Sequence, residues 1–153
     1  MTRRGSIAYY LAAAVCGSFF LAASYYGYFL WAGSSSQHWG RDFFFLYFFG
    51  LLFGVVPLIL SAWALRRVAA WLGWRQGGQW LLAGTGIFVT VIWGLGRLGI
   101  ALTDAVFPGV MTLMPLLGGP MFAALYPPWI PLPAAIATAW VLHSVHRAFE
   151  EQK

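Results

Sequence analysis

The sequence has few charged side chains and very few acidic ones. Charged residues form 8% of the 153 positions, with four Asp or Glu against nine Lys or Arg. In a soluble domain about a quarter of the residues are normally charged, because its surface must be polar. Apolar residues instead form 61% of this chain, and its mean hydropathy is +0.73. The composition excludes a soluble globule and predicts a protein whose solvent is lipid.

The scarcity of carboxylates also restricts function. No Asp or Glu lies inside any apolar stretch, whereas secondary transporters and proton channels usually place such groups near the middle of the membrane. Cysteine is equally scarce: Cys16 is single, can form no disulfide within the chain, and is most simply a packing residue. The residues that hydrolytic and metal-dependent enzymes need are missing as well. We therefore expect a protein that is not an enzyme and has no metal site.

Four apolar stretches are long enough for helices that cross, or nearly cross, about 30 Å of hydrocarbon. We predict spans at 7–31, 43–65, 80–102 and 131–147, in one transmembrane domain covering residues 1–153. Pro57 should kink the second span. The predicted fold class is therefore all-α, an integral membrane protein built as a bundle of four transmembrane helices.

A proline-rich segment separates the third and fourth spans. Seven of the eight prolines lie between residues 108 and 133, so a continuous helix is not expected there. We predict an outer interfacial or re-entrant segment at 106–130, with a short helix broken at Gly118, Gly119 and Pro120. The alternative is a fifth span from Val110 to Tyr126, which would move the C-terminus to the other side.

Basic residues predict the orientation of the chain. In the four-span arrangement seven of them fall on one side of the membrane, and only Arg41 and Arg97 lie on or towards the other. The positive-inside rule then predicts a multi-pass protein of the bacterial inner (cytoplasmic) membrane with both termini cytoplasmic. This topology explains the net charge of +5 without nucleic-acid binding. The seven are Arg3, Arg4, Arg66, Arg67, Arg75, Arg147 and Lys153.

Glycines in the second and third spans predict close helix packing. The third span contains GLGRLG, with Gly94, Gly96 and Gly99, which formally matches the dinucleotide-binding pattern GxGxxG. That pattern works only in a turn between a strand and a helix, so within an apolar span it is better interpreted as a packing face. Gly50 and Gly54 form a GxxxG pair in the second span, to which we assign the same role.

Two charges lie in or beside the third span, and we expect them near its outer end. Arg97 and Asp104 are seven residues apart, which places them on nearly the same helix face about 10 Å apart along the axis. We predict Asp42 as the partner of Arg97 and Arg41 as the partner of Asp104. These four residues form either a structural ion-pair set or a surface that recognises lipid headgroups, a partner subunit or a substrate.

Three histidines are candidates for contact with a cofactor. His38 lies in the outer loop, while His143 and His146 lie near the cytoplasmic end of the last span. The two groups are too far apart to share one iron, and residues three apart on one helix cannot bind opposite faces of a haem. His143 and His146 also complement the dipole at the end of their helix. The sequence requires no cofactor and identifies none.

The predicted function is that of a non-catalytic accessory or scaffolding subunit of a larger bacterial inner-membrane complex. Its 19% aromatic content and its 18 glycines suit contact with partner helices and with lipid or pigment. The expected partners are membrane lipids and other membrane subunits, in homo- or hetero-oligomers. One alternative is a small transporter or lipid-handling protein that uses Arg97. Another is an electron-transfer subunit that contacts haem or quinone near His143 and His146.

Overall fold

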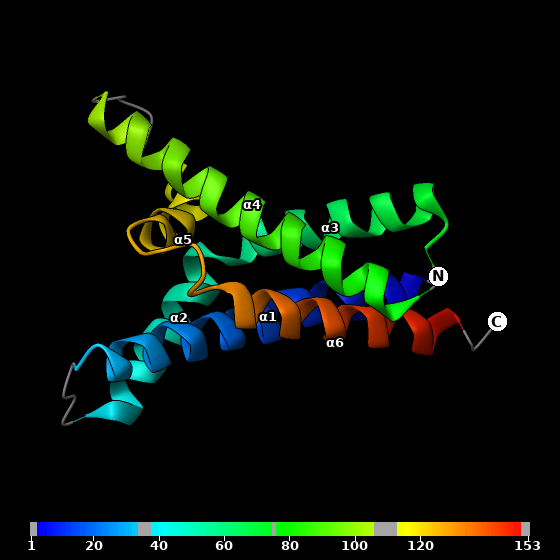
Figure 1. Cartoon of the computed structure of the whole chain (residues 1–153), viewed down its shortest axis with the longest axis horizontal. Helices are drawn as coiled ribbons and strands as arrows, with labels where there is room; N and C mark the ends of the chain where they lie inside the picture. Colours follow the sequence, from blue (N-terminus) through cyan, green and yellow to red (C-terminus); the bar gives the residue numbers. More distant parts are fainter. Residues whose placement is uncertain (1–2, 34–37, 75, 106–112, 151–153) are drawn as a thin grey trace.

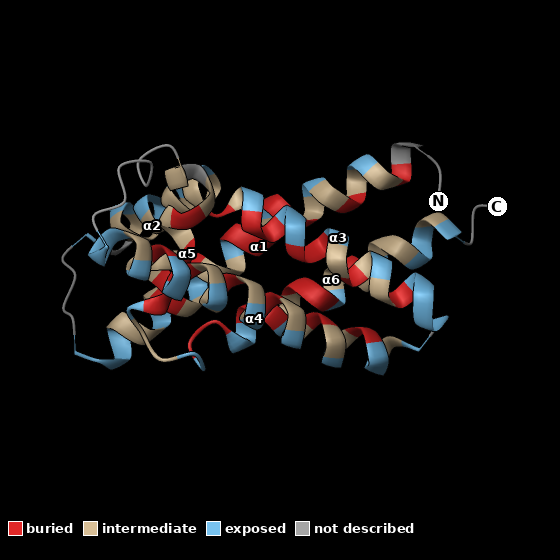
Figure 2. Ribbon diagram, turned by 90° about the horizontal axis from the view of Figure 1, so that it is seen from above, coloured by how far each residue is buried: buried red, intermediate tan, exposed pale blue. Residues whose placement is uncertain are grey.

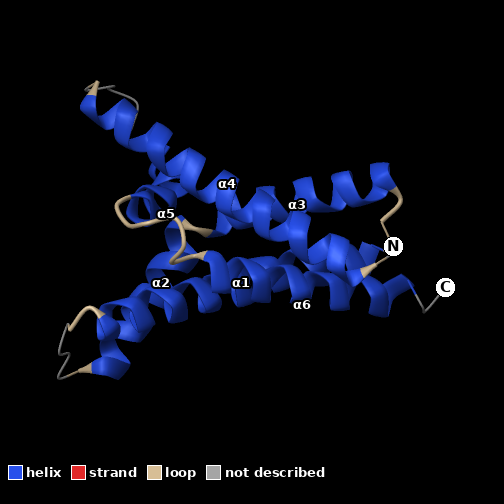
Figure 3. Ribbon diagram, viewed as in Figure 1, coloured by secondary structure: helices blue, strands red, loops and turns tan. Residues whose placement is uncertain are grey.

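The protein is all-α. The computed structural model describes residues 3–33, 38–74, 76–105 and 113–150, and none of them belongs to a strand (Figures 1 and 3). Three helical segments are long and apolar enough to cross a membrane, which indicates a multi-pass membrane protein: Gly5–Trp31, Val55–Leu72 and Gly77–Asp104. The helices of the described residues are α1 (Arg3–Trp31), α2 (Trp39–Phe53), α3 (Val55–Leu72), α4 (Gly77–Asp104), α5 (Met114–Ala124) and α6 (Leu132–Glu150).

The helices form an elongated bundle with two distinct ends (Figure 1). Helix α1 begins and α6 ends at one end, where α3 also leads into α4; we call this the terminal end. At the opposite end α1 finishes, α2 begins and α4 finishes. Helix α1 packs against α6, α2 and α3, while α4 packs against α5, α6 and α3. The chain therefore alternates between the two ends of one bundle.

Both the inward and the outward faces of the helices are largely apolar, and the inward faces combine many small side chains with a few large ones such as Trp80 and Phe88. Small residues such as Ala13, Ala62 and Ala139 are fully buried between helices (Figure 2). Large apolar residues point outward, including Leu82 on α4, which is 81% exposed, and Phe45 on α2, which is 68% exposed. A surface of this kind is stable in contact with lipid or another protein rather than with water.

The predicted second span consists of two helices rather than one kinked helix. Helices α2 and α3 meet at Gly54 and run in different directions (Figure 1). Pro57 explains the break, because a proline has no N–H to donate to the carbonyl of Phe53 four residues earlier. Pro57 itself lies in the first turn of α3, where a missing N–H costs nothing. The prediction identified the proline correctly, but the chain breaks at the glycine before it.

The proline-rich segment contains a helix that is not broken where we predicted. Helix α5 continues through Gly118, Gly119 and Pro120, and it packs against both α4 and α2. The glycines allow this contact, since a β-carbon at Gly119 would lie 2.6 Å from the carbonyl oxygen of Phe53. With 11 residues, α5 is about 16 Å long, half of what a crossing needs, and so gives no support to a fifth span. Residues 106–112 of the segment lie outside the described residues.

Candidate functional site at the terminal end

A polar pocket opens at the terminal end of the bundle, and we call it the end pocket. Its volume is about 350 Å³, within the lower part of the usual range for sites that bind small ligands, about 300–1,000 Å³. Three helices and the turn between α3 and α4 contribute to it. The lining residues are Arg66, Ala69, Ala70, Gly73, Trp74, Trp80, His146 and Glu150.

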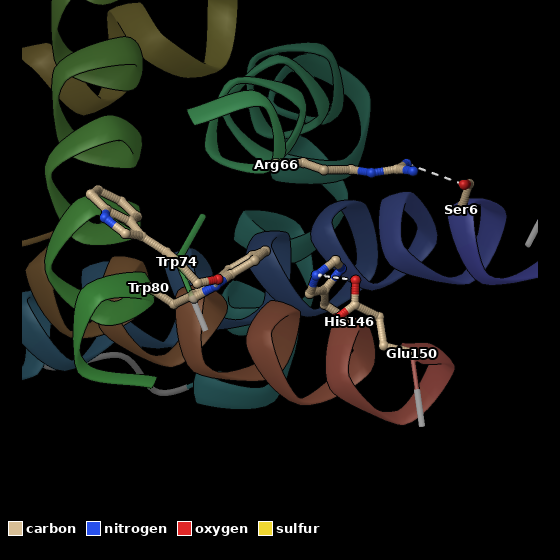
Figure 4. Close-up of polar contacts among 6 residues, drawn as sticks. All are labelled: Ser6, Arg66, Trp74, Trp80, His146 and Glu150. Atoms are coloured by element: carbon tan, nitrogen blue, oxygen red, sulfur yellow. Dashed lines mark hydrogen bonds and ion pairs between the residues drawn. The ribbon is translucent and has the colours of Figure 1, made fainter. Parts of the chain in front are cut away.

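A tight turn gives the end pocket one fixed wall. Gly73 ends α3 in the left-handed conformation, with φ of 63°, which glycine adopts without strain. The N–H of Trp74 donates to the carbonyl of Ala69 at 3.0 Å. The indole Nε1 of Trp80 then donates to the carbonyl of Trp74 at 3.3 Å (Figure 4). Because Trp80 is buried, this bond anchors the turn to the start of α4.

Opposite charges occupy two sides of the end pocket. Arg66, from α3, donates from Nη1 to the Ser6 hydroxyl of α1 at 3.1 Å (Figure 4). The Oε1 atom of Glu150, from α6, lies 3.2 Å from the Nε2 atom of His146. The side chain of Glu150 is 58% exposed. The pocket thus presents a guanidinium and a carboxylate to whatever enters it.

The surroundings of His146 favour its neutral form. Its Nδ1 atom is buried and has no hydrogen-bond partner among the described residues. A protonated ring would bury an unpaired N–H there, whereas a neutral ring protonated on Nε2 leaves only an unpaired acceptor, at smaller cost. The Nε2 proton is then the one that faces Glu150. Glu150 therefore accepts a hydrogen bond from a neutral ring rather than pairing with a cation.

The structure separates the histidines as predicted. His143 and His146 lie beside the buried Trp80, with ring centroids 5.6 and 4.7 Å from its ring. His38 is the N-cap of α2, which begins at the opposite end (Figure 1). Within the described part of the chain, no group of three His, Cys, Asp or Glu side chains could hold a metal ion. Contact of these histidines with haem or quinone stays a prediction.

The four charges assigned to the opposite end do not pair as predicted. Arg41 lies 3.6 Å from its neighbour Asp42, measured from Nε to Oδ1, and both are at the surface. Arg97 instead lies over the ring of Trp93, with its guanidinium carbon 5.4 Å from the ring centroid. Asp104 is the last residue of α4 and is exposed. Recognition of lipid or a partner by these residues stays a prediction.

The glycines of α4 fall into two groups. A β-carbon at Gly96 would collide with the carbonyl oxygen of Pro120 in α5, and one at Gly99 would lie 2.5 Å from Met121 Cγ. Gly84 is as tightly packed, with Ala139 Cβ at 2.5 Å from such a β-carbon. Gly94, which we assigned to the same packing face, has no atom of another described helix within 4 Å of the position that a β-carbon would take. GLGRLG therefore packs inside the chain at its second and third glycines only.

The glycines of the second span also differ from each other. A β-carbon at Gly50 would meet Ser18 Cβ of α1 at an ordinary 3.5 Å. Gly54 lies at the junction of α2 and α3, where a β-carbon would lie 2.6 Å from the carbonyl oxygen of Gly50. Gly50 therefore faces a neighbouring helix, whereas Gly54 serves the bend.

A comparison with known proteins finds no matching protein family, no similar curated protein and no similar solved structure. Functional proposals for this chain therefore depend on its own geometry.

The sequence contained one signal of the end pocket that we did not use. His143, His146 and Glu150 follow one another at intervals of three and four residues, which places them on one face of a helix. The other half of the pocket could not be found in this way. Arg66 is 80 residues before His146, and only the packing of both α3 and α6 against α1 and α4 brings it there.

Proposed function

We propose that the protein is a non-catalytic accessory subunit of a larger bacterial inner-membrane complex, and that the outward side of α4 binds a transmembrane helix of a partner chain. The observation that carries this proposal is a row of small exposed residues on α4: Gly86, Thr90 and Gly94. Each follows the previous one by four residues. Neither glycine has any atom of the described residues within 4 Å of the position that a β-carbon would take.

A row of this kind is suited to contact between helices in a membrane. Small residues four apart allow two backbones to approach closely, and packing then supplies the attraction that the hydrophobic effect cannot supply in lipid. Leu82 and Leu98 extend the row at both ends and are exposed. Arg97 lies next to the row, held over Trp93, so a charged group of the partner would find it there.

The interior of the bundle supports a structural role over transport. Two cavities between the helices have volumes of only about 40 and 10 Å³, with nearly all of their lining apolar. Several buried hydroxyl groups form internal bonds: Tyr9 donates to the carbonyl of Ala62 at 3.2 Å, and Thr138 to that of Ala134 at 2.7 Å. A transport pathway needs polar groups that face water or substrate near the middle of the membrane.

The arrangement of the helices supports four crossings with both termini on the cytoplasmic side. Helix α1 begins and α6 ends at the same end of the bundle (Figure 1), as an even number of crossings requires. Helices α2 and α3 together cover the length of the second crossing. Arg66, Arg67 and Arg147 lie on the halves of α3 and α6 nearest the terminal end, where the positive-inside rule places the cytoplasm.

The proposal is tested by purification in mild detergent followed by mass spectrometry of all proteins that remain bound. We expect a stable partner at fixed stoichiometry with the unchanged protein, and its loss when Gly86 and Gly94 are both replaced by leucine. The matched control is Gly27→Leu, because Gly27 is also an exposed glycine in a long apolar helix without neighbours within 4 Å of a β-carbon.

Two results would contradict the proposal. One is a protein that purifies without any other chain, as a monomer or a homo-oligomer. The other is a partner that stays bound to the double leucine variant. Arg97→Ala tests the edge of the same surface: we expect a lower yield of the complex, with the fold of the isolated protein unchanged because Arg97 is exposed.

A further inference from the structure

We infer that the end pocket binds the headgroup of a zwitterionic phospholipid that carries a primary ammonium group, as phosphatidylethanolamine does. Arg66 would bind the phosphate, and Glu150 would accept hydrogen bonds from the ammonium. This inference concerns the terminal end of the bundle and is independent of the partner surface on α4, so one can fail while the other holds.

Arg66 is placed to bind a phosphate. A guanidinium has five N–H donors in a planar fork that fits phosphate oxygens in pairs. One donor is used by Ser6 at 3.1 Å, and no other acceptor among the described residues takes a hydrogen bond from the remaining four. Arg66 is only partly exposed, so its charge is screened less than that of a fully solvated side chain. The bond to Ser6 also fixes its orientation before a ligand arrives.

Glu150 makes the pocket unsuitable for a purely anionic ligand and suitable for a zwitterion. It lies in the same pocket as Arg66, and the neutral form of His146 leaves its charge in place. A second phosphate or a carboxylate would be repelled there, whereas an ammonium would find an acceptor with one oxygen still unused. A pocket lined by one cation and one anion thus matches a ligand with one of each.

The position of the end pocket favours a lipid over a soluble ligand. It lies where α3 ends, α4 begins and α6 ends (Figure 1), and α3 and α4 are long and apolar enough to cross a membrane. Trp74 lines it, and Trp71, the last residue but one of α3, is 83% exposed. Tryptophan is enriched at the level of lipid headgroups. Acyl chains attached to the ligand would continue along the outer surface of the helices.

The small residues Ala69, Ala70 and Gly73 on the α3 wall keep the end pocket open. Ala70→Leu would fill part of this space without removing a charge, since Ala70 is exposed and its replacement disturbs no core contact. It therefore provides a variant in which loss of binding cannot result from loss of a charged group.

The test is native mass spectrometry of the full-length protein in detergent, titrated with phosphatidylethanolamine, phosphatidylcholine or phosphatidylglycerol of equal chain length. We expect phosphatidylethanolamine to bind at least about tenfold more tightly than the other two, because each of them lacks one of the two charged hydrogen-bonding groups. Arg66→Gln and Glu150→Gln should each weaken its binding by about tenfold or more. Glu150→Gln should leave binding of the other two lipids nearly unchanged, whereas Arg66→Gln should weaken their binding as well, because all three carry a phosphate.

Matched controls are available for both charges. Arg67→Gln changes the adjacent arginine, which is exposed and lies over Trp63 instead, and Asp104→Asn removes a carboxylate at the opposite end. Both should bind phosphatidylethanolamine as the unchanged protein does. Size-exclusion chromatography and circular dichroism of each variant establish that it is folded before its affinity is compared.

Three outcomes would overturn the inference. The first is phosphatidylglycerol binding as tightly as phosphatidylethanolamine. The second is Glu150→Gln binding lipid as well as, or better than, the unchanged protein, since this would mean that the carboxylate repels the ligand. The third concerns the source of the group: free phosphoethanolamine that binds as tightly as the lipid would show that the site serves a soluble ligand.

Discussion

The two sides of α4 carry the same residue type in opposite surroundings. On the inner side, Gly84, Gly96 and Gly99 are in contact with α6 and α5, and a β-carbon at any of them would lie 2.5 Å or less from another helix. On the outer side, a β-carbon at Gly86 or Gly94 would have no atom of another helix within 4 Å among the residues that the structure describes. The inner glycines allow helices of this chain to pack closely against one another. The outer ones retain the same capacity for another chain.

This difference shows that a glycine pattern in a membrane helix indicates close packing against another helix. It does not show whether that helix belongs to the same chain or to a partner. It also predicts that replacing glycine by alanine has opposite effects on stability at the two sides of the helix. Alanine has the higher helix propensity, by about 1 kcal/mol, so it should stabilise the outer side. On the inner side its methyl group would force helices apart.

The largest effect is expected at Gly96. Gly96→Ala places a methyl group against the backbone of Pro120, which cannot move as a flexible side chain could, so we expect the free energy of unfolding to fall by about 3 kcal/mol or more. Gly94→Ala, two residues earlier, is the control and should be neutral or slightly stabilising. Unfolding of both in mild detergent with increasing dodecyl sulfate, followed by circular dichroism, measures the difference. Equal stability of the two variants would refute the division of α4 into two sides.

A smaller effect is expected at Gly84. A β-carbon there would lie 2.5 Å from Ala139 Cβ and 3.2 Å from Leu65 Cδ2. These are side-chain atoms that can shift in part, so Gly84→Ala should cost about 1–2 kcal/mol. Gly86→Ala provides the matched control on the outer side, and the same unfolding measurement applies. If Gly84→Ala were the more stable of the pair, α6 would have to pack less closely on α4 than described.

The smallest effect is expected for the hydrogen bond that holds α5 against α1, because α5 is the helix packed on the inner side of α4. The Tyr25 hydroxyl donates to the carbonyl of Ala123 at 3.1 Å and so ties α1 to α5, the helix packed on Gly96. Tyr25→Phe removes this bond and should lower the free energy of unfolding by about 1 kcal/mol. Tyr28→Phe is the control, because its hydroxyl bonds to none of the described residues. A loss at Tyr28 equal to that at Tyr25 would assign the effect to aromatic packing instead.

Hydropathy and proline were sufficient to predict the long helices. The apolar stretches at 7–31 and 80–102 correspond closely to α1 and α4, because a helix in lipid must satisfy all its backbone groups internally and cannot stop within the hydrocarbon. Pro57 correctly indicated that the second span is not one straight helix. The break itself lies at Gly54, three residues before the proline, and α5 packs there against Phe53, a contact between segments distant in sequence.

The candidate sites were less predictable, for a related reason. A single helix reveals which of its residues share a face, so the grouping of His146 with Glu150 was within reach. It does not reveal what stands opposite, and therefore Arg66 beside this face could not be assigned in advance. Trp93 and Arg97, four residues apart on α4, share a face, so their contact was also within reach. The ion pairs that we predicted for Arg97 and Asp104 assumed that charged residues at a similar depth in the membrane contact each other. The helices that carry these residues do not bring them together.

The bond between Tyr25 and Ala123 has a consequence for biosynthesis. The two residues are 98 positions apart, so at about 5–20 residues per second the ribosome needs roughly 5–20 s to deliver the acceptor after the donor. Throughout that interval α1 is already made, while its tyrosine hydroxyl must bond to water or to the insertion machinery, since lipid offers no acceptor in the hydrocarbon. Helix α1 therefore cannot complete its contact with α5 until about a hundred more residues have been made.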